Sequence, residues 1–450
     1  MADKPNNSFS SPVLSGSISP AVEILPDDIL TNWAGNIQFS TNQVLYPKSV
    51  AEVQVLVQRH KQLKGLGSRH CFNQIADSEH CFLATKELNK VVALNTEART
   101  VTVEAGIKYG ELAPFLHKNG FALPNLASLP HISVAGSVIT ATHGSGVTNG
   151  NLATSVVSLE IVTADGNVQT LSQNKQGAIF NGMVVNLGAL GIITKLTLAI
   201  EPAFMVQQNV YEKLPLTQLK NNFEKIAAAG YSVSLFTDWT DDSINQVWIK
   251  SRLGENNKQI LGGEFYGAQA AVQNRHPILE MPAENCTEQM GIPGPWHERL
   301  PHFKMGFTPS SGVELQSEYF IPRQHAVEAI LAVARLGKKI SPHLLISEIR
   351  TIAADNFWLS PCYQQPSVAI HFTWKQDWPA VSKLLPIIEQ ELAPFNVRPH
   401  WGKLFTMSPQ VLASRYEKLP DFINLVSQYD PYGKFRNQFL YTTVFGGERV

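Results

Sequence analysis

One stretch of 23 residues, Asn125–Val147, constrains the fold more than any other part of the chain. It contains no Asp, Glu, Lys or Arg, and 12 of its residues are Gly, Ala, Ser or Thr. Small side chains let the backbone approach a large ligand, and amides and hydroxyls can neutralise a diphosphate by hydrogen bonding where no Lys is supplied. We interpret the stretch as a cofactor cradle, although its composition also fits a buried small-residue strand and turn.

A second segment rich in Gly and Ser, Gly65–Asn73, lies upstream and contains a single His, His70. A Gly-x-Gly-x-x-His loop, followed about 60 residues later by a small-residue segment ending in Thr-His-Gly-Ser-Gly, resembles the flavoproteins of the vanillyl-alcohol oxidase family. Within that family, residues 123–137 are similar to the alditol and xylitol oxidases in particular. The resemblance extends from about Asn32 to the C-terminus and implies a PCMH-type FAD-binding fold.

Length and charge limit the class of protein and its partners. A chain of 450 residues suggests two or three domains. Its 36 Lys and Arg balance 37 Asp and Glu without a basic block, so neither nucleic acid nor a membrane is expected as a partner. The four scattered cysteines give no metal or disulfide signature. We expect residues 1–30 to form a disordered tail. Because the sequence lacks a signal-peptide pattern, we expect a cytoplasmic protein. We also expect a monomer.

Hydrophobic periodicity predicts alternating strands and helices over the first 200 residues. Ser49 can cap one helix, and a second helix is expected from about Gly110 to Asn119. The sequence 164–166, Ala-Asp-Gly, predicts a hairpin, and residues 191–200 predict a closing strand. No Gly-x-Gly-x-x-Gly opens a β-α-β unit, so a Rossmann site and bound NAD are not expected.

A different composition begins near Met205 and predicts an antiparallel sheet covered by helices on one face. Helices are expected near 216–229, 324–336 and 378–392. Side chains two apart on a strand share a face. One face should therefore carry three polar pairs: Glu348 with Arg350, Gln316 with Glu318, and His371 with Thr373.

The intervening apolar residues, including Leu345 and Ile349, are expected to pack under the helices, although Leu344 and Ile346 share the face of Glu348. Two interpretations of the polar face remain open. It could be an ordinary solvated face, or it could cover a flavin.

The resemblance implies a substrate site on this polar face. Mixed charged and polar side chains suit a polyol, because a chain of hydroxyls offers a donor and an acceptor at every carbon. Arg350 and Lys403 are expected to polarise the reacting hydroxyl, while Glu348 orients it or accepts its proton; these three are the expected catalytic residues. The expected substrate-binding residues are Ser128, Gln316, Glu348, Arg350, Thr373 and Lys403.

The resemblance also implies FAD, attached covalently through His70 to the flavin 8α-methyl carbon. Arg69 and Cys71 stand where close relatives commonly carry Gly or Arg and then Ser, which bears on the ease of attachment. Lys403 is a candidate for the flavin N1/C2=O edge, and His131 is expected to be structural. The expected cofactor-binding residues are Gly65, Gly67, Ser68, Arg69, His70, Cys71, Ser128, Ser133, Gly136, Ser137, Thr140, Thr142, His143, Gly144, Val147, Ile193, Lys403 and Asn437.

Together these features predict an α+β flavoprotein with two domains. Residues 1–203 and 404–450 would hold FAD, and residues 204–403 would form a substrate-binding cap. The expected reaction is oxidation of the terminal hydroxyl of an alditol such as xylitol or sorbitol, with O2 reduced to hydrogen peroxide. An aldonolactone oxidase or dehydrogenase of the same fold is an alternative. So is a flavin-binding protein without turnover.

Overall fold

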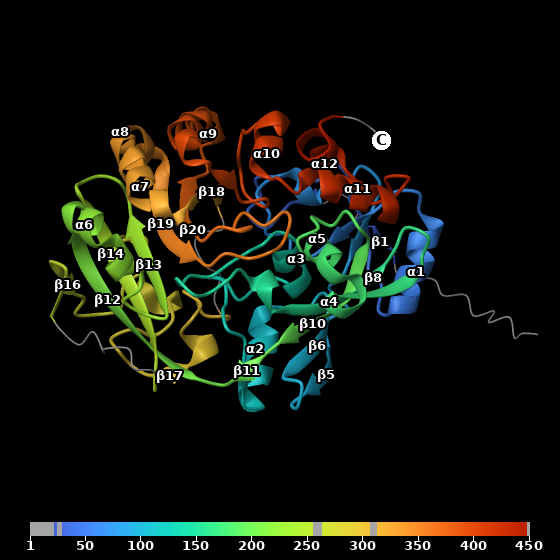
Figure 1. Ribbon diagram of the computed structural model, residues 1–450, viewed down its shortest axis with the longest axis horizontal. Coiled ribbons are helices and arrows are strands. Elements are labelled where there is room, and N and C mark those ends of the chain that lie inside the picture. The colour runs from blue at the N-terminus through green and yellow to red at the C-terminus, as the bar shows by residue number, and fades with distance from the viewer. Residues whose placement is uncertain (1–21, 25–28, 255–262, 307–312, 448–450) are drawn as a thin grey trace, which may run out of the picture.

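Four β-sheets, of four, five, two and ten strands, build the α+β architecture of the computed structural model together with the surrounding helices (Figure 1). The two-stranded sheet pairs β7 Phe121–Ala122 with β11 Glu201–Pro202. The structure describes residues 22–24, 29–254, 263–306 and 313–447. The disordered tail expected over residues 1–30 lies almost wholly outside the described residues. None of the described helices is both long and apolar enough to span a bilayer.

The Gly-rich loop follows a strand of a small four-stranded sheet, in the order β1-β2-β4-β3. Strands β2 and β3 run parallel to β4, as the predicted β-α-β order requires. Ser49 caps helix α1 by accepting a hydrogen bond from the Glu52 amide, as predicted. The bounds are β1 Val22–Ile24, β2 Gln43–Leu45, α1 Val50–Arg59, β3 Lys64–Leu66 and β4 Phe82–Ala84.

A five-stranded antiparallel sheet supports the cradle, in the order β5-β6-β10-β8-β9. The predicted hairpin joins β8 to β9, and the predicted closing strand, β10, lies in the centre of the sheet between β6 and β8. Helix α2 ends before Gly120, whose φ of +82° suits a residue without a Cβ. The bounds are β5 Val91–Asn95, β6 Thr100–Glu104, α2 Tyr109–Lys118, β8 Val156–Val162, β9 Val168–Ser172 and β10 Ile192–Ala199.

A short helix, α3 (Val134–Ile139), forms within the cradle, where the sequence analysis predicted no helix. Val134 and Val138, one helical turn apart, are fully buried in the core against the five-stranded sheet. Gly136 and Ser137 lie on other sides of the helix and line the large cavity described below. Helical spacing thus separates the residues that anchor the cradle from those that line the cavity.

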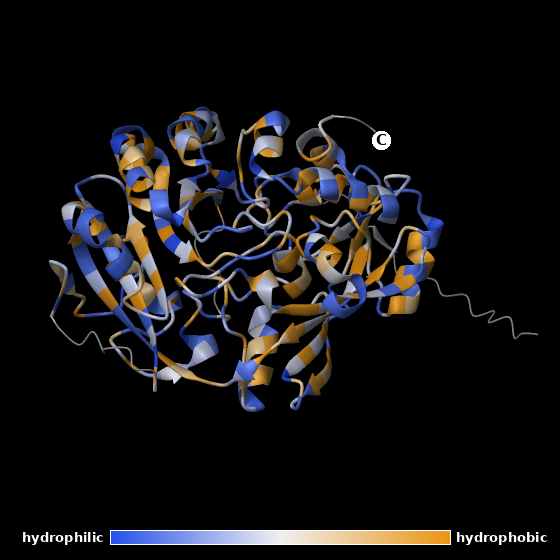
Figure 2. Ribbon diagram, in the orientation of Figure 1, coloured by the Kyte–Doolittle hydropathy of each residue, from blue (hydrophilic) through white to orange (hydrophobic). Residues whose placement is uncertain are grey.

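The predicted antiparallel sheet is present, with ten strands in the principal order β15-β16-β12-β14-β13-β19-β20-β18-β21 and with β17 beside β12. Helices α6, α7 and α9 share one hydrophobic core with its covered face, and the outer helices carry hydrophilic as well as hydrophobic residues (Figure 2). The bounds are β12 Met205–Pro215, α6 Leu216–Ala227, β13 Ser232–Thr237, β14 Ser243–Arg252, β15 Glu264–Phe265, β16 Ala268–Ala270, β17 Gly294–Pro295, β18 Glu314–Pro322, α7 Ala326–Arg335, β19 Leu344–Ile352, β20 Ser367–Lys375, α9 Trp378–Leu392 and β21 Arg398–Pro399.

An irregularity at the start of β19 corrects one prediction about which residues face the helices. The pairing of β19 with β20 shifts register between Leu344 and Ile346. Because an extra residue at a bulge reverses the alternation, Leu344 packs in the core under the helices, whereas Leu345 packs on the opposite face. The prediction that Leu345 lies under the helices is therefore wrong, and that for Ile349 is confirmed.

Three helices near the C-terminus, which the sequence reasoning did not identify, complete the hydrophobic core beneath the cradle, which we call the first core. They are α10 Pro409–Arg415, α11 Leu419–Tyr429 and α12 Gln438–Thr443. Figure 1 shows α11 and α12, in red, beside the blue N-terminal elements at the opposite end from α6. Leu412, Phe422 and Leu440 pack in the same core as helices α2 and α3.

Candidate active site

An open cavity lies between the cradle and the polar face of the large sheet. On one side it is lined by residues 64–72 and by parts of the cradle, and on the other by strands β18, β19 and β20. The cofactor wall and the polar face of the sheet therefore border the same cavity.

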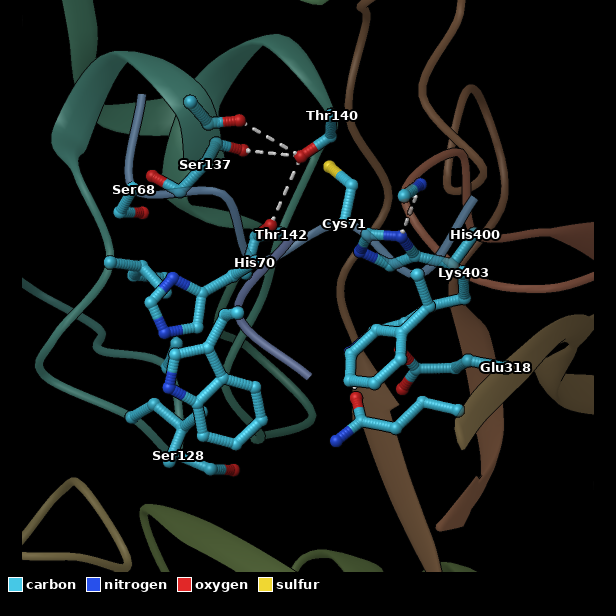
Figure 3. Close-up of a pocket in the computed structure, with 18 of the residues that line it drawn as sticks. Ser68, His70, Cys71, Ser128, Ser137, Thr140, Thr142, Glu318, His400 and Lys403 are labelled. Atoms are coloured by element: carbon cyan, nitrogen blue, oxygen red, sulfur yellow. Dashed lines mark hydrogen bonds between the residues drawn. The ribbon is translucent and has the colours of Figure 1, made fainter. Parts of the chain in front are cut away.

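His70 faces this cavity from the Gly-rich loop, close to Ser68 and Thr142 (Figure 3). Its ring stacks on Trp33, with 5.2 Å between the ring centroids. Both ring nitrogens are buried without a hydrogen-bond partner among the described residues. Burial, reinforced by the nearby positive charge of Lys403, lowers the pKa of His70 to about 3. The ring is therefore neutral, with a free lone pair available for bonding.

Arg69 and Cys71, the two unusual neighbours of His70, leave its ring accessible. Arg69 adopts a left-handed conformation, with φ of 62°, and its exposed side chain donates to the Thr31 carbonyl at 3.1 Å. Cys71 lines the cavity, and burial raises the pKa of its thiol to about 11. A neutral thiol is a poor nucleophile, so Cys71 is no competitor for the role expected of His70.

The cradle fits a large polar cofactor on two observations. A Cβ added to Gly67 would lie 2.7 Å from Ser133 Oγ, and one added to Gly136 would lie 2.9 Å from the same oxygen. Larger side chains would fill the space that these glycines leave for a ligand. In addition, Ser133 Oγ is buried with no partner among the described residues, which leaves a hydroxyl available to a ligand oxygen.

Most of the residues expected to bind the cofactor line the cavity, and the structure brings them together from two distant parts of the sequence. Those that line it are Gly65, Gly67, Ser68, Arg69, His70, Cys71, Ser128, Gly136, Ser137, Thr140, Thr142, His143 and Lys403. The hydroxyl of Thr140 lies 3.2 Å from that of Thr142 and donates to the Gly136 carbonyl at 3.0 Å (Figure 3).

Five of the expected residues lie behind the cavity wall. Ser133 is next to it, as described above. Ile193 belongs to the core beneath α3, and Val147 packs against the core of the large sheet. Gly144 lies against Asn125 and Leu126, so its role is to allow close packing.

Asn437 is the fifth of these residues, and its side chain is fully engaged elsewhere. Its Oδ1 caps helix α12 by accepting from the Leu440 amide, and its Nδ2 donates to the carbonyls of Gln74, Ile75 and Asp77. The hydrogen bonds of this side chain are therefore directed at the protein backbone and not at the cofactor. Instead, Asn437 fixes the turn that follows the His70 loop.

The polar face of the large sheet is buried, so the solvated-face interpretation is wrong. Glu318 on β18 pairs in register with His371 on β20, which pairs in turn with Glu348 on β19. Each of these three side chains is at most 8% exposed. The six residues expected to bind substrate, Ser128, Gln316, Glu348, Arg350, Thr373 and Lys403, all line the cavity.

Arg350 lies between two carboxylates. Its Nη2 donates to Glu318 Oε1 at 2.7 Å, and its Nε lies 3.6 Å from Glu348 Oε1. A third contact runs from Nη1 to Ser128 Oγ, at 3.3 Å, and so links the sheet to the cradle. Burial opposes ionisation of both carboxyls, but the charge of Arg350, together with neighbouring His rings, holds their pKa values well below the usual range.

Lys403 reaches the same cavity from the segment after β21. Its Nζ donates to Gln316 Oε1 and lies 4.7 Å from the centroid of the Phe72 ring. Burial lowers the pKa of Lys403, and the Glu318 carboxylate opposes this shift. Figure 3 shows Lys403 across the cavity from His70 and near Glu318. Lys403 thus presents its amine to the cavity from the side opposite His70.

Two further residues of the site, Glu318 and Lys64, were assigned no role in binding or catalysis from the sequence. Glu318 accepts from Arg350 and lies 3.1 Å from His143 Nε2; its spacing from Gln316 was the available signal. Lys64 lines the cavity with a buried side chain whose Nζ donates to three backbone carbonyls. His131, outside the cavity lining, contacts the Met305 carbonyl, in keeping with the structural role expected of it.

Comparison with known proteins agrees with this geometry. Residues 41–172 match the FAD binding domain family, and residues 307–443 match the D-arabinono-1,4-lactone oxidase family. The cholesterol oxidase of B. sterolicum is similar in fold, with a TM-score of 0.76 over 94% of this chain and 99% of that one. At 16% sequence identity, that similarity shows the fold alone.

Two curated relatives are similar over nearly their whole length. L-gulonolactone oxidase of Mus musculus is 27% identical over 91% of this chain and 96% of its own. The alditol oxidase of Streptomyces sp. is 49% identical over 91% of this chain and 98% of its own. With this degree of identity and an FAD-binding fold of the vanillyl-alcohol oxidase type, the chain belongs to the alditol oxidase family of FAD-dependent oxidoreductases.

Proposed function

We propose that this protein oxidises the terminal CH2–OH group of an alditol, such as xylitol or sorbitol, to the aldose. The observation that carries the proposal is a cluster of charges, formed by the buried Glu318, Glu348 and Arg350 and the partly buried Lys403, on the same cavity as His70. When bound, FAD would accept the hydride and pass the electrons to O2, giving hydrogen peroxide. The protein itself would supply positioning and charge.

A polyol suits the wall formed by the sheet because its hydroxyls can pair with each kind of group present. Arg350 and Lys403 are donors that can polarise the reacting hydroxyl, and Glu348 is an acceptor for its proton. Ser128 and Thr373 can both donate and accept. A substrate that lacked one hydroxyl would leave a buried polar group without a partner, which costs about 1–3 kcal/mol.

The proposal divides the work between two parts of the chain. Residues 1–203 and 404–450 would hold FAD, and residues 204–403 would cover it and bind the substrate. In support, the core under α6, α7 and α9 is built almost entirely from residues 211–404, whereas helices α10–α12 pack with the first core.

An aldonolactone substrate is the second candidate, because lactone oxidases and dehydrogenases are also similar in sequence over most of the chain. A lactone presents a ring with fewer free hydroxyls than an open-chain alditol. The rival substrate therefore makes less use of the many donors and acceptors on the cavity wall.

We expect xylitol or sorbitol, mixed with the enzyme without oxygen, to bleach the yellow flavin, and air to restore the colour with release of peroxide. Aldonolactones should bleach it at least tenfold more slowly. Rapid mixing with absorbance detection, followed by a peroxide assay over a series of polyols and lactones, measures both. A flavin that no polyol bleaches contradicts the proposed function, and fast reduction of a dye without peroxide contradicts the oxidase activity.

The covalent attachment of FAD through His70 is proposed from the neutral ring and its two unpartnered nitrogens. Denatured wild-type protein should fluoresce under ultraviolet light on a gel after acid treatment, and His70→Ala should lose this signal completely. His131→Ala is the matched control, because it also removes a His but one whose ring contacts the Met305 carbonyl, in keeping with a structural role. It should keep the fluorescence. A dark wild-type band would contradict the covalent bond while leaving FAD binding intact.

A further inference from the structure

A buried lysine of the large sheet, Lys250, lies behind the proposed substrate site. It is on strand β14 and only 1% exposed. Its Nζ donates to the carbonyls of Leu300 at 2.5 Å and Pro301 at 3.1 Å, and lies 3.1 Å from His302 Nδ1. An ammonium has three N–H donors and a neutral amine has two, so the three acceptors favour the charged form. Burial lowers the pKa of Lys250 to about 7, so its charge depends on these contacts.

These contacts fix the tautomer of His302. Because Nδ1 accepts a hydrogen bond from Lys250, the ring proton must be on Nε2, which donates to Glu348 Oε1 at 2.8 Å. Burial, reinforced by the positive charge of Lys250, lowers the pKa of His302 to about 4, so the ring is neutral. The rings of Phe236 and Trp248 pack edge-on against it, with centroids 5.5 and 5.2 Å away, and hold its orientation.

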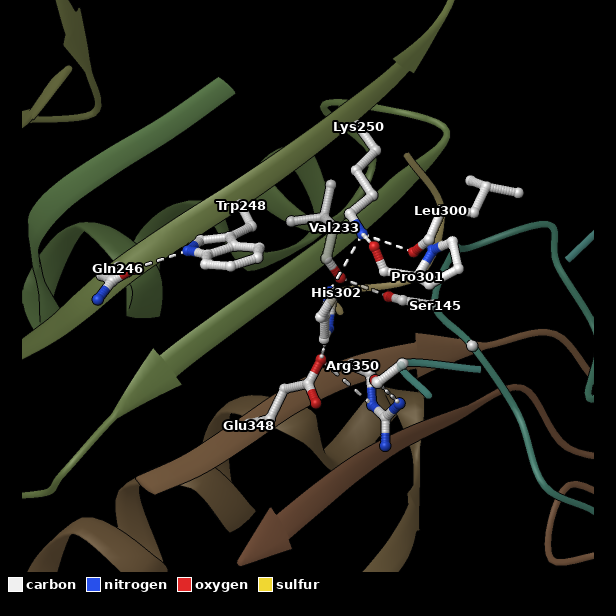
Figure 4. Close-up of polar contacts among 12 residues, drawn as sticks. Ser145, Val233, Gln246, Trp248, Lys250, Leu300, Pro301, His302, Glu348 and Arg350 are labelled. Carbon is white, nitrogen blue, oxygen red and sulfur yellow. Dashed lines mark hydrogen bonds and ion pairs between the residues drawn. The ribbon is translucent and has the colours of Figure 1, made fainter. Parts of the chain in front are cut away.

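The chain of contacts ends at Glu348 and leaves one of its oxygens available. Oε1 accepts from His302 and lies near Arg350, whereas Oε2 has no hydrogen-bond partner among the described residues. Oε2 is not sealed off from the surrounding space, and Glu348 lines the cavity. Figure 4 shows the sequence of contacts from Lys250 through His302 to Glu348 and Arg350.

We propose that Lys250 and His302 are positioning residues that hold the Glu348 carboxylate ionised, with Oε2 directed at the reacting hydroxyl of the substrate. This inference rests on the proposed function and deepens it. The O–H bond of the substrate breaks and its proton passes to Oε2, which becomes a carboxylic acid. The electron pair of the O–H bond forms the second C–O bond of the product, and the two electrons of the breaking C–H bond leave with the hydride, which FAD, when bound, would accept.

The direction of the contacts excludes His302 as the exit for that proton. Its Nε2 already carries a hydrogen and donates it to Glu348, so it cannot accept a second one from the same carboxyl group. Lys250 and His302 therefore act through orientation and charge. A purely structural role, in which Lys250 only satisfies the carbonyls before His302, is the competing account.

Three variants separate the two accounts. Lys250→Met keeps the approximate length of the side chain and removes the charge, His302→Leu removes both ring hydrogen bonds, and His302→Gln retains an amide that can donate to Glu348 and accept from Lys250. Rapid mixing with xylitol, without oxygen, gives the limiting rate of flavin bleaching and the apparent Kd.

We expect the bleaching rate to fall about tenfold in Lys250→Met and about thirtyfold in His302→Leu, because misorientation of a reacting group costs rate more than binding. His302→Gln should recover most of the loss, and the Kd should change by less than about threefold. Lys213→Met, which removes an exposed ion pair with Asp241 on the same sheet, should match wild type.

Nitrogen-15 NMR of histidine-labelled holoenzyme provides a readout that does not depend on turnover. The wild type should show His302 with its proton on Nε2, and the Nδ1 resonance should shift in Lys250→Met, because Nδ1 loses its hydrogen-bond donor. An unchanged Nδ1 resonance and rate in Lys250→Met, or a His302→Gln variant as slow as His302→Leu, overturns the proposal. If no polyol bleaches the wild-type flavin, the proposed function fails, while the tautomer measurement still tests the contacts themselves.

Discussion

Arg350→Ala is expected to lower kcat/KM for xylitol by a factor on the order of 10² or more, equivalent to about 2.7 kcal/mol. Arg350 is 7% exposed and contacts Glu318, Glu348 and Ser128. Its removal takes away a charged donor to the substrate and leaves two buried carboxylates without their shared counter-charge, which raises their pKa values. The steady-state rate of peroxide release over a range of xylitol concentrations measures the loss.

Two further variants show whether the loss comes from the geometry of the guanidinium group and whether it is specific to Arg350. Arg350→Lys keeps the charge but not the planar fork that reaches three partners at once, so it should still lose at least tenfold. Arg275→Ala removes a partly exposed arginine that pairs with Glu212 within residues 204–403. Its kcat/KM for xylitol should stay within about twofold of wild type. Flavin content should be normal in all three. Activity of Arg350→Ala within twofold of wild type would remove Arg350 from the site.

Gly144→Ala is expected to lose most of its bound FAD and roughly 2–3 kcal/mol of stability, as overpacking against fixed neighbours usually costs. A Cβ here would lie 2.2 Å from Asn125 Oδ1 and 2.3 Å from the Leu126 carbonyl oxygen. Asn125 cannot move aside easily, because its side chain accepts from the Leu126 amide and donates to the Gly150 carbonyl. The displaced segment carries His143, which contacts Glu318, so the disturbance reaches the cavity.

The visible flavin absorbance per protein and the Tm measure these two losses. Gly263→Ala is the matched control, because a Cβ there meets no heavy atom of the described residues within 4 Å and the backbone is not in the left-handed region. It should keep its FAD and a Tm within about 1 °C of wild type. A Gly144→Ala variant that behaves like Gly263→Ala would show that the cradle is more adaptable than its packing indicates.

Local patterns in the sequence predicted the features that depend on near neighbours. The strand that carries Glu348 and Arg350 was identified because alternation needs no knowledge of distant residues. The resemblance placed His70 and the substrate-binding residues, all of which line the cavity. The alternation failed only where a bulge exchanged the positions of Leu344 and Leu345, which depends on pairing with β20.

Features that depend on distant pairing were not predictable in this way. Glu318 and His143 are 175 residues apart in the chain, and nothing local to either shows that they meet. From the sequence, Lys64 is an ordinary strand residue. Only the folded structure shows that its amine donates to the carbonyls of Leu187, Gly188 and Phe435. The side chain of Asn437 was expected at the cofactor, yet carbonyls more than 350 residues upstream occupy it.

The return of helices α10–α12 to the first core has a consequence for synthesis on the ribosome. Residues 211–404 contain nearly all of one hydrophobic core and can fold once they have emerged. The core beneath the cradle still lacks Leu412, Phe422 and Leu440 at that stage, and the turn after the His70 loop lacks Asn437. The hydrophobic core of residues 211–404 can therefore be completed before the core beneath the cradle, although the cradle lies earlier in the sequence.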